Sequence, residues 1–134
     1  MKIIGEILLV IVVLFGGLML LQLVASESGE VVVVETTNAE GQVEETRLWV
    51  VDHDQAQWLR SGSPMAGWYQ RLEANPQVSV ERAGEVFTAQ ARPDVSQRGV
   101  INELMREKYG WADQFISLMF GRDDAIAIEL VVTD

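Results

Sequence analysis

MKIIGEILLVIVVLFGGLMLLQLVASE, residues 1–27, is the stretch on which the organisation of this chain depends. The run from Ile7 to Val24 contains 18 residues and no charge, which is about the shortest apolar run that spans a bilayer as a helix. With residues 3–6 added, a helix rising ~1.5 Å per residue reaches roughly 33 Å, enough to cross a hydrocarbon core of ~30 Å. The sequence therefore predicts a transmembrane anchor over residues 1–25, a polar linker over 26–30 and one domain over 31–134.

A cleaved secretory signal and a buried core helix are the two alternative interpretations of this stretch. A signal sequence has an apolar core of ~7–15 residues behind several positive charges. Here the apolar core is longer, and Lys2 is the only basic side chain before it. Leu23-Val24-Ala25 is a weak match to a small-residue cleavage site. We therefore expect a retained anchor.

The basic residues beside the span predict its orientation, because they favour the cytoplasmic side. Lys2 precedes the span, and the next basic residue after it is Arg47. We therefore expect a single pass through the inner or cytoplasmic membrane. The C-terminal domain would then be extracytoplasmic, and periplasmic in an organism with two membranes.

The composition of the remaining chain excludes several partners and sites. The net charge is −10, so the domain repels nucleic acid, whose binding requires clustered cations. The chain has no cysteine, which excludes disulfides and thiolate metal sites, and it has one histidine, His53. We expect no metal site, although Asp52-His53-Asp54 superficially looks like a ligand cluster, because adjacent side chains on a strand point in different directions.

Apolar periodicity and turn residues predict the elements of the domain. Hairpin-joined strands favour an antiparallel sheet closed into a small barrel, so the expected fold class is α+β with helices packed on the barrel. We expect Val31–Val34 to be buried on both faces. The expected inward side chains are Val100, Ile101, Leu104 and Met105 in one helix, and Phe115, Ile116 and Met119 in the next. The predicted strands are 31–37, 43–52, 57–60, 77–82, 85–91 and 125–133, and the predicted helices are 65–75, 95–108 and 111–120.

Several segments resemble, in their order, the deazaflavin-dependent nitroreductase/quinone reductase family. They are Thr36-Thr37, WYQRLEANPQVSV from Trp68 to Val80, Ala89-Gln90-Ala91-Arg92 and the closing IAIELVV. The resemblance covers about Val31 to the C-terminus. It implies a split β-barrel, like that of flavin-binding pyridoxamine-phosphate-oxidase relatives, in a divergent membrane-anchored member.

The chain departs from this family where the family holds the cofactor's phosphate. A Gly-Arg-Lys-Ser-Gly type loop follows the paired threonines in the family, whereas this chain has Asn38-Ala39-Glu40-Gly41-Gln42, then Glu44-Glu45. Carboxylates at these positions repel a phosphate. The family's Ser-Gly-Gly landmark becomes Ser61-Gly62-Ser63-Pro64, and Arg71 replaces its helix asparagine. We therefore expect no cofactor, with flavin or deazaflavin as the alternative.

Five residues are the candidates for a cofactor site. Arg47 and Arg60 could supply the lost cations from strands facing one pocket, or they could be ordinary surface charges. Trp68 and Tyr69 could stack on a ring, although packing between helix and barrel also explains them. Ser61 stands at the family's serine landmark.

Two functions fit the sequence. In the first, the barrel has lost its cofactor and is an extracytoplasmic binding or assembly module. In the second, it is a membrane-tethered reductase of quinones or nitro compounds. The expected partners are the lipid bilayer and either a second copy in a homodimer or a membrane protein, without nucleic acid.

Overall fold

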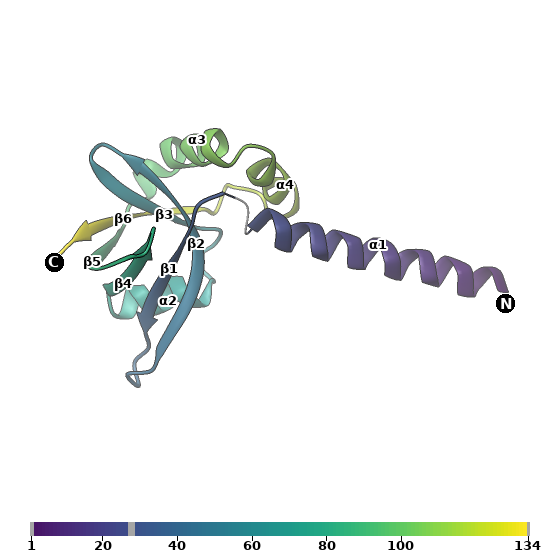
Figure 1. Cartoon of the computed structure of the whole chain (residues 1–134), viewed down its shortest axis with the longest axis horizontal. Coiled ribbons are helices and arrows are strands. Elements are labelled where there is room, and N and C mark those ends of the chain that lie inside the picture. Colours follow the sequence, from purple (N-terminus) through teal and green to yellow (C-terminus); the bar gives the residue numbers. More distant parts are fainter. Residues whose placement is uncertain (1, 27–28, 134) are drawn as a thin grey trace.

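A long N-terminal helix projects from a six-stranded barrel in the computed structural model, which describes residues 2–26 and 29–133 (Figure 1). Helix α1 is Lys2–Ser26. Its segment Lys2–Val24 has a mean hydropathy of 2.9 with nothing buried, so it is long and apolar enough to cross a membrane. A signal sequence would have the same properties, so retention and orientation stay predictions. Of the expected linker 26–30, residues 27 and 28 lie outside the described residues.

The barrel confirms the predicted α+β class. All neighbouring strands are antiparallel, and the order is β1-β2-β3-β6-β5-β4 with β1 paired to β4. Closure leaves no strand edge without a partner. The strands are β1 Val31–Thr37, β2 Val43–His53, β3 Ala56–Ser61, β4 Gln77–Arg82, β5 Glu85–Pro93 and β6 Ile126–Val132.

Strand β1 is fully buried on one face only, so the prediction of two buried faces was wrong. Val32, Val34 and Thr36 are fully buried, whereas Val31 and Val33 are half-buried. In a closed barrel one face of each strand fills the interior, and the other is covered only where a helix packs on it. The run of valines therefore reflects β propensity more than burial on both sides.

The apolar core has two parts because side chains alternate along the strands. Val50 points into the barrel, where the interior cluster also contains Leu59, Ile128 and three α2 side chains, Trp68, Tyr69 and Leu72. The next residue, Val51, points outward and packs against α3. Helix α2 therefore closes the barrel interior, and α3 covers its outside.

The helices lie close to their predicted positions. Asp94 caps the 3₁₀ turn that precedes α3, because its side chain accepts a hydrogen bond from the backbone N–H of Ser96 (3.0 Å). Two side chains expected inward are instead exposed, Val100 by 42% and Met119 by 41%. In α3 the buried stripe runs through Ile101, Met105 and Tyr109, four residues apart. The helices are α2 Gly67–Ala74, a 3₁₀ turn Val95–Gln97, α3 Arg98–Tyr109 and α4 Trp111–Phe120.

The β4–β5 turn allows a stability prediction. Ala83 and Gly84 have φ values of 52° and 81°, as in the two-residue turns that favour Asn-Gly. Alanine is strained at positive φ, so Ala83→Asn is expected to raise the free energy of unfolding by about 0.5–1 kcal/mol. Denaturant unfolding in detergent measures the change. Ala39→Asn is the control and should give no gain, because Ala39 is not among the residues with positive φ.

Candidate functional site

Three arginines surround a small hollow between β2, β3 and α4, which we call the arginine pocket. Arg47 comes from β2, Arg60 from β3 and Arg122 from the loop that follows α4. The volume is about 170 Å³. Within residues 2–26 and 29–133, none of the lining residues carries a carboxylate: they are Arg47, Leu48, Trp49, Arg60, Gly62, Ile116 and Arg122.

One carboxylate holds two of these arginines in place. Asp113, on the inner face of α4, accepts from Arg60 Nη2 at 2.6 Å and from Arg122 Nη2 at 2.7 Å. The Asp113 and Arg60 side chains are only 5% and 7% exposed. Arg60 also donates to Asn102 Oδ1 (3.3 Å) and lies 6.0 Å from the centre of the Trp49 ring. The guanidinium groups of Arg60 and Arg122 are therefore held in place before any ligand binds.

Arg60 and Arg122 together carry more positive charge than Asp113 can neutralise. Burial and the neighbouring Arg122 charge lower the pKa of Arg60 below its ordinary value, against the opposing effect of Asp113. The Nε of Arg122 is buried and has no hydrogen-bond partner within residues 2–26 and 29–133. A guanidinium group donates five hydrogen bonds in a planar fork that matches carboxylate and phosphate oxygens. The arrangement is suited to binding a small anion.

The structure brings together two of the five predicted site residues, Arg47 and Arg60. Ser61 is fully buried, and its hydroxyl donates to the carbonyl of Ser63 at 2.7 Å. Trp68 and Tyr69 pack in the barrel interior, as the packing interpretation predicted. Whether any of the five binds a cofactor stays a prediction.

Sequence reasoning missed Arg122 and Asp113. A signal for Asp113 was present, because it is the only charged residue in the apolar stretch WADQFISLMF, Trp111–Phe120. An acidic residue inside such a helix requires a cationic partner when it is buried. Nothing in the sequence identified which arginines those partners would be.

The loop that replaces the family's phosphate loop is occupied by its own contacts. Asn38 Oδ1 accepts from the backbone N–H groups of Glu40 (3.0 Å) and Gln42 (2.9 Å). Among the described residues that line the adjacent hollow, Arg71 is the one cation, and it contacts Glu44 at 3.5 Å and Thr36 Oγ1 at 2.8 Å. The described residues of this loop therefore include no cation, and whether the loop binds a phosphate stays a prediction. The sequence argument against cations is incomplete for the domain, because the cations gather at the arginine pocket.

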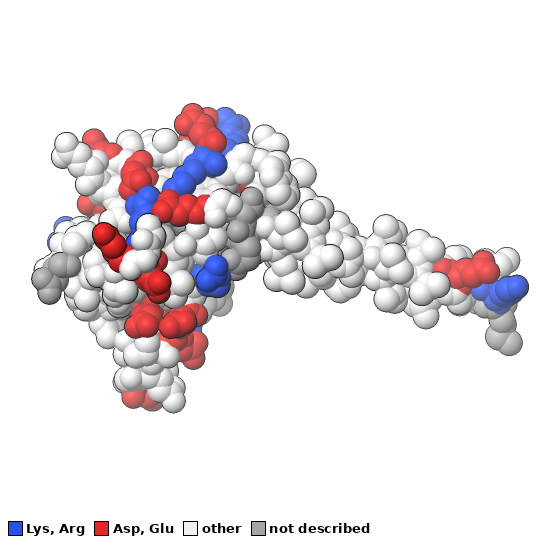
Figure 2. All heavy atoms as spheres, in the orientation of Figure 1, with Lys and Arg blue, Asp and Glu red and all other residues white. Residues whose placement is uncertain are grey.

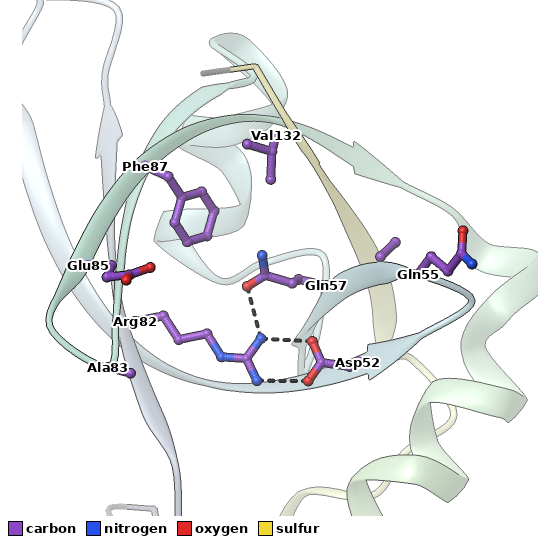
Figure 3. A pocket seen from close by; sticks show the side chains of 9 residues that line it. Asp52, Gln55, Gln57, Arg82, Ala83, Glu85, Phe87 and Val132 are labelled. Carbon is purple, nitrogen blue, oxygen red and sulfur yellow. Dashed lines mark hydrogen bonds and ion pairs between the residues drawn. The ribbon is translucent and has the colours of Figure 1, made fainter.

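A second, larger hollow of about 620 Å³ lies beside Arg82 (Figure 3). The Arg82 guanidinium is held between Asp52 (2.8 and 2.9 Å) and Gln57 (2.9 Å), and it also contacts Glu30 at 3.0 Å. Its charge is thus neutralised by two carboxylates, which makes this hollow a poor anion site. Asp52 is used in this ion pair, and no group of three metal-binding side chains was found among the described residues.

Glu30, at the end of the linker, is bound to the barrel by several contacts, which we call the Glu30 clamp. Its carboxylate accepts from Arg82 at 3.0 Å and from Lys108 at 2.7 Å, and these hydrogen bonds lower its pKa from 4.5 to about 2. The Tyr109 hydroxyl donates to the Glu30 carbonyl at 2.6 Å, and burial raises the pKa of Tyr109 to about 12. The Tyr109 ring also stacks on Trp49 at 4.2 Å. The first residues of β1 are thereby tied to the end of α3.

The Glu30 clamp predicts a loss of stability in acid. The folded-state pKa of about 2 is lower than the unfolded value of 4.5. The stabilisation is therefore complete above pH 4.5 and is lost as the pH falls towards 2. Thermal unfolding between these pH values measures the loss. Glu30→Gln should reduce the pH dependence, without removing it, because Asp52 also has a lowered pKa; an unchanged pH profile would contradict the assignment.

Comparison with known proteins gives structural relatives only. No family profile matches the sequence, and no curated protein matches it. Among solved structures, a conserved hypothetical protein of Mycobacterium tuberculosis is 16% identical, with a TM-score of 0.62 over 87% of this chain and 79% of that one. HutZ, the heme storage protein of Vibrio cholerae, is 19% identical, with a TM-score of 0.58 over 82% and 86%. An F420-H2 dependent reductase is 24% identical, with a TM-score of 0.56 over 74% and 92%.

The chain has the fold of these proteins. The similarity confirms the split barrel that the resemblance implied. Since fold does not determine function, what this chain binds must be argued from its own pocket.

Proposed function

We propose that this chain is a membrane-tethered split-barrel module that binds a phosphate-type anion in the arginine pocket. The observation that carries the proposal is the meeting of Arg47, Arg60 and Arg122 around a hollow whose described lining residues include no carboxylate. This concentration of cations occurs in a chain whose net charge is −10. Recognition of an anion explains why guanidinium groups cluster in an otherwise acidic protein.

The size of the pocket favours a small anion, or one anionic end of a larger molecule. Sites for organic ligands usually enclose about 300–1,000 Å³, and this hollow has about 170 Å³. A flavin-type cofactor therefore fits here through its phosphate and not through its ring system. The residues present do not fit the whole cofactor, which supports a binding module in preference to a reductase.

The second candidate function is a flavin- or deazaflavin-dependent reductase of quinones or nitro compounds. The likeness to an F420-H2 dependent reductase favours it, and the phosphate of such a cofactor would occupy the same arginines. A second copy of the chain would have to complete the ring site. One structural neighbour is a domain-swapped dimer, 24% identical over 74% of this chain, which is consistent with a homodimer.

Titration of the full chain in detergent separates the two functions. Trp49 lines the pocket, so its fluorescence is expected to report binding. The ligands are inorganic phosphate, flavin mononucleotide and riboflavin, which has the ring without the phosphate. If the chain is a binding module, we expect a colourless protein that binds phosphate and does not bind riboflavin. Purification of a coloured protein with near-stoichiometric flavin or deazaflavin would favour the reductase function over the binding module. Failure of phosphate to bind would contradict the anion site.

We also propose that α1 is retained and that the domain lies outside the cytoplasm. The support is Lys2 before the span and the absence of basic residues from there to Arg47. Protease added to spheroplasts should digest the domain while a cytoplasmic control protein survives. Survival of the domain until the cells are lysed would contradict this orientation.

A further inference from the structure

Helix α4 presents apolar side chains to solvent on its outer face. Trp111 is 53% exposed and Leu118 is 87% exposed. The opposite face is buried, with Ala112 fully buried and Asp113 bound to two arginines of the barrel. A soluble amphipathic helix has polar residues on its outer side. The outer face of α4 therefore suits an apolar or interfacial environment.

The membrane-spanning segment ends beside this helix. The C-terminal part of α1 lies against α4 (Figure 1). The chain from Ser26 to Val31 makes five Cα–Cα steps, which reach at most about 18 Å at ~3.6 Å each. The barrel is therefore held close to the membrane surface, with α4 on the side where the span emerges.

The Glu30 clamp fixes this arrangement at the α3–α4 junction. The Glu30 carbonyl is bound by Tyr109, and its carboxylate by Lys108. Tyr109 is the last residue of α3, and α4 begins at Trp111. The linker and the start of α4 are thus joined through hydrogen bonds in addition to the covalent chain.

The distribution of charged side chains also favours a bilayer on the α4 side of the domain. Asp113 is the only charged residue of α4, and it faces the barrel. Figure 2 shows acidic side chains gathered over the end of the β1–β2 hairpin and over the α3 side, whereas the surface that adjoins α1 has few. On the face that Figure 2 shows, these carboxylates therefore lie away from α1, whereas Asp123 and Asp124 are exposed in the loop that follows α4.

We propose that α4 lies in the interface of the same bilayer that α1 spans, with Trp111 and Leu118 among the lipids. The proposal rests on the retained anchor proposed above, and it does not require the anion site. Tryptophan is enriched at membrane interfaces, and interfacial helices bury an apolar face at the boundary between head groups and acyl chains. Because Ile116 of α4 also lines the arginine pocket, the pocket lies at the level of the membrane surface.

The absence of cysteine makes this inference directly testable. Single spin labels are introduced through Leu118→Cys, Leu14→Cys in the middle of the span, and Val132→Cys. Val132 is a matched exposed apolar control at 52% exposure, on the end of β6 that Figure 1 places away from α1. The full chain is reconstituted at low protein density in phosphatidylcholine vesicles. Accessibility of each label to oxygen and to a water-soluble nickel chelate is then measured.

We expect the label at Leu118 to be poorly accessible to the nickel chelate, like the label at Leu14, whereas the label at Val132 stays accessible to it. A Leu118 label as accessible to nickel as the Val132 label overturns the proposal, even when the Leu14 label shows that the span is inserted. Protection of Leu118 only at high protein density would assign the face to a second copy, and protection only after addition of a cell extract would assign it to a protein partner; both results overturn the proposal. Phosphate titration of the same samples tests the anion site independently.

Discussion

Asp113→Ala is expected to lower the free energy of unfolding by about 3–5 kcal/mol, the usual result of removing one partner from a buried ion pair. The substitution leaves the Arg60 guanidinium, 7% exposed, beside Arg122 with no carboxylate between them. Two like charges in a region of low dielectric repel strongly. Denaturant or thermal unfolding of the full chain in detergent measures the loss.

Glu103→Ala is the matched control for this substitution. Glu103 also forms an ion pair with an arginine, Arg106, at 2.6 Å, but both side chains are more than half exposed. The control should change stability by less than about 1 kcal/mol. If Asp113→Ala had as small an effect as Glu103→Ala, the account of a preorganised arginine pocket would be wrong.

Phosphate should partly rescue the Asp113→Ala variant. An anion that binds only the folded state raises stability by mass action, and the variant has more unneutralised charge to offer it. We therefore expect a larger rise in the unfolding temperature with phosphate for the variant than for the unaltered chain. Equal shifts in both proteins would indicate that phosphate acts elsewhere.

Arg47→Gln is expected to weaken phosphate binding by about 10–100-fold, because a hydrogen bond to a charged group contributes about 1.5–3 kcal/mol. Arg47 is exposed on β2, so its replacement should leave the unfolding temperature nearly unchanged. The loss would then be one of binding and not of folding. Titration calorimetry in detergent measures the affinity for phosphate of the unaltered full chain and of the Arg47→Gln variant.

Arg92→Gln controls for the change in net charge. Arg92 is an exposed residue of β5 and does not line the arginine pocket. Its replacement removes the same charge from the chain, and long-range attraction is screened within roughly 8–10 Å at ordinary ionic strength. An equal loss of affinity in both variants would mean that phosphate responds to net charge alone.

The strands and the order of elements could be predicted because their signals are local. The alternation in Val78 and Val80 places both in the interior, and Asn75-Pro76 follows a helix that ends at Ala74. Local patterns were less reliable within helices. In α3 the bulky Tyr109 belongs to the buried stripe and Val100 does not, because the contact with the barrel selects which side of the helix faces inward.

The candidate site could be predicted only in part because it is assembled from distant segments. The sequence left open whether Arg47 and Arg60 face one pocket or are ordinary surface charges, and the structure places both beside the same hollow. Arg122 lies 62 positions beyond Arg60 in the sequence and joins the two only after Asp113 of α4 has paired with Arg60 of β3. The acidic loop Asn38–Gln42 indicated a lack of cations at that place only, and it could not reveal a cation cluster formed by tertiary folding.

The most direct test is an experimental crystal structure of the full chain soaked in tungstate, a heavy tetrahedral anion, read as an anomalous difference map. The account predicts a peak within hydrogen-bond distance of the Arg47, Arg60 and Arg122 guanidinium groups, and its loss in Arg47→Gln crystals. A peak beside Arg82 and Lys108 instead, or no peak at the three arginines, would contradict the proposal that this barrel binds an anion there.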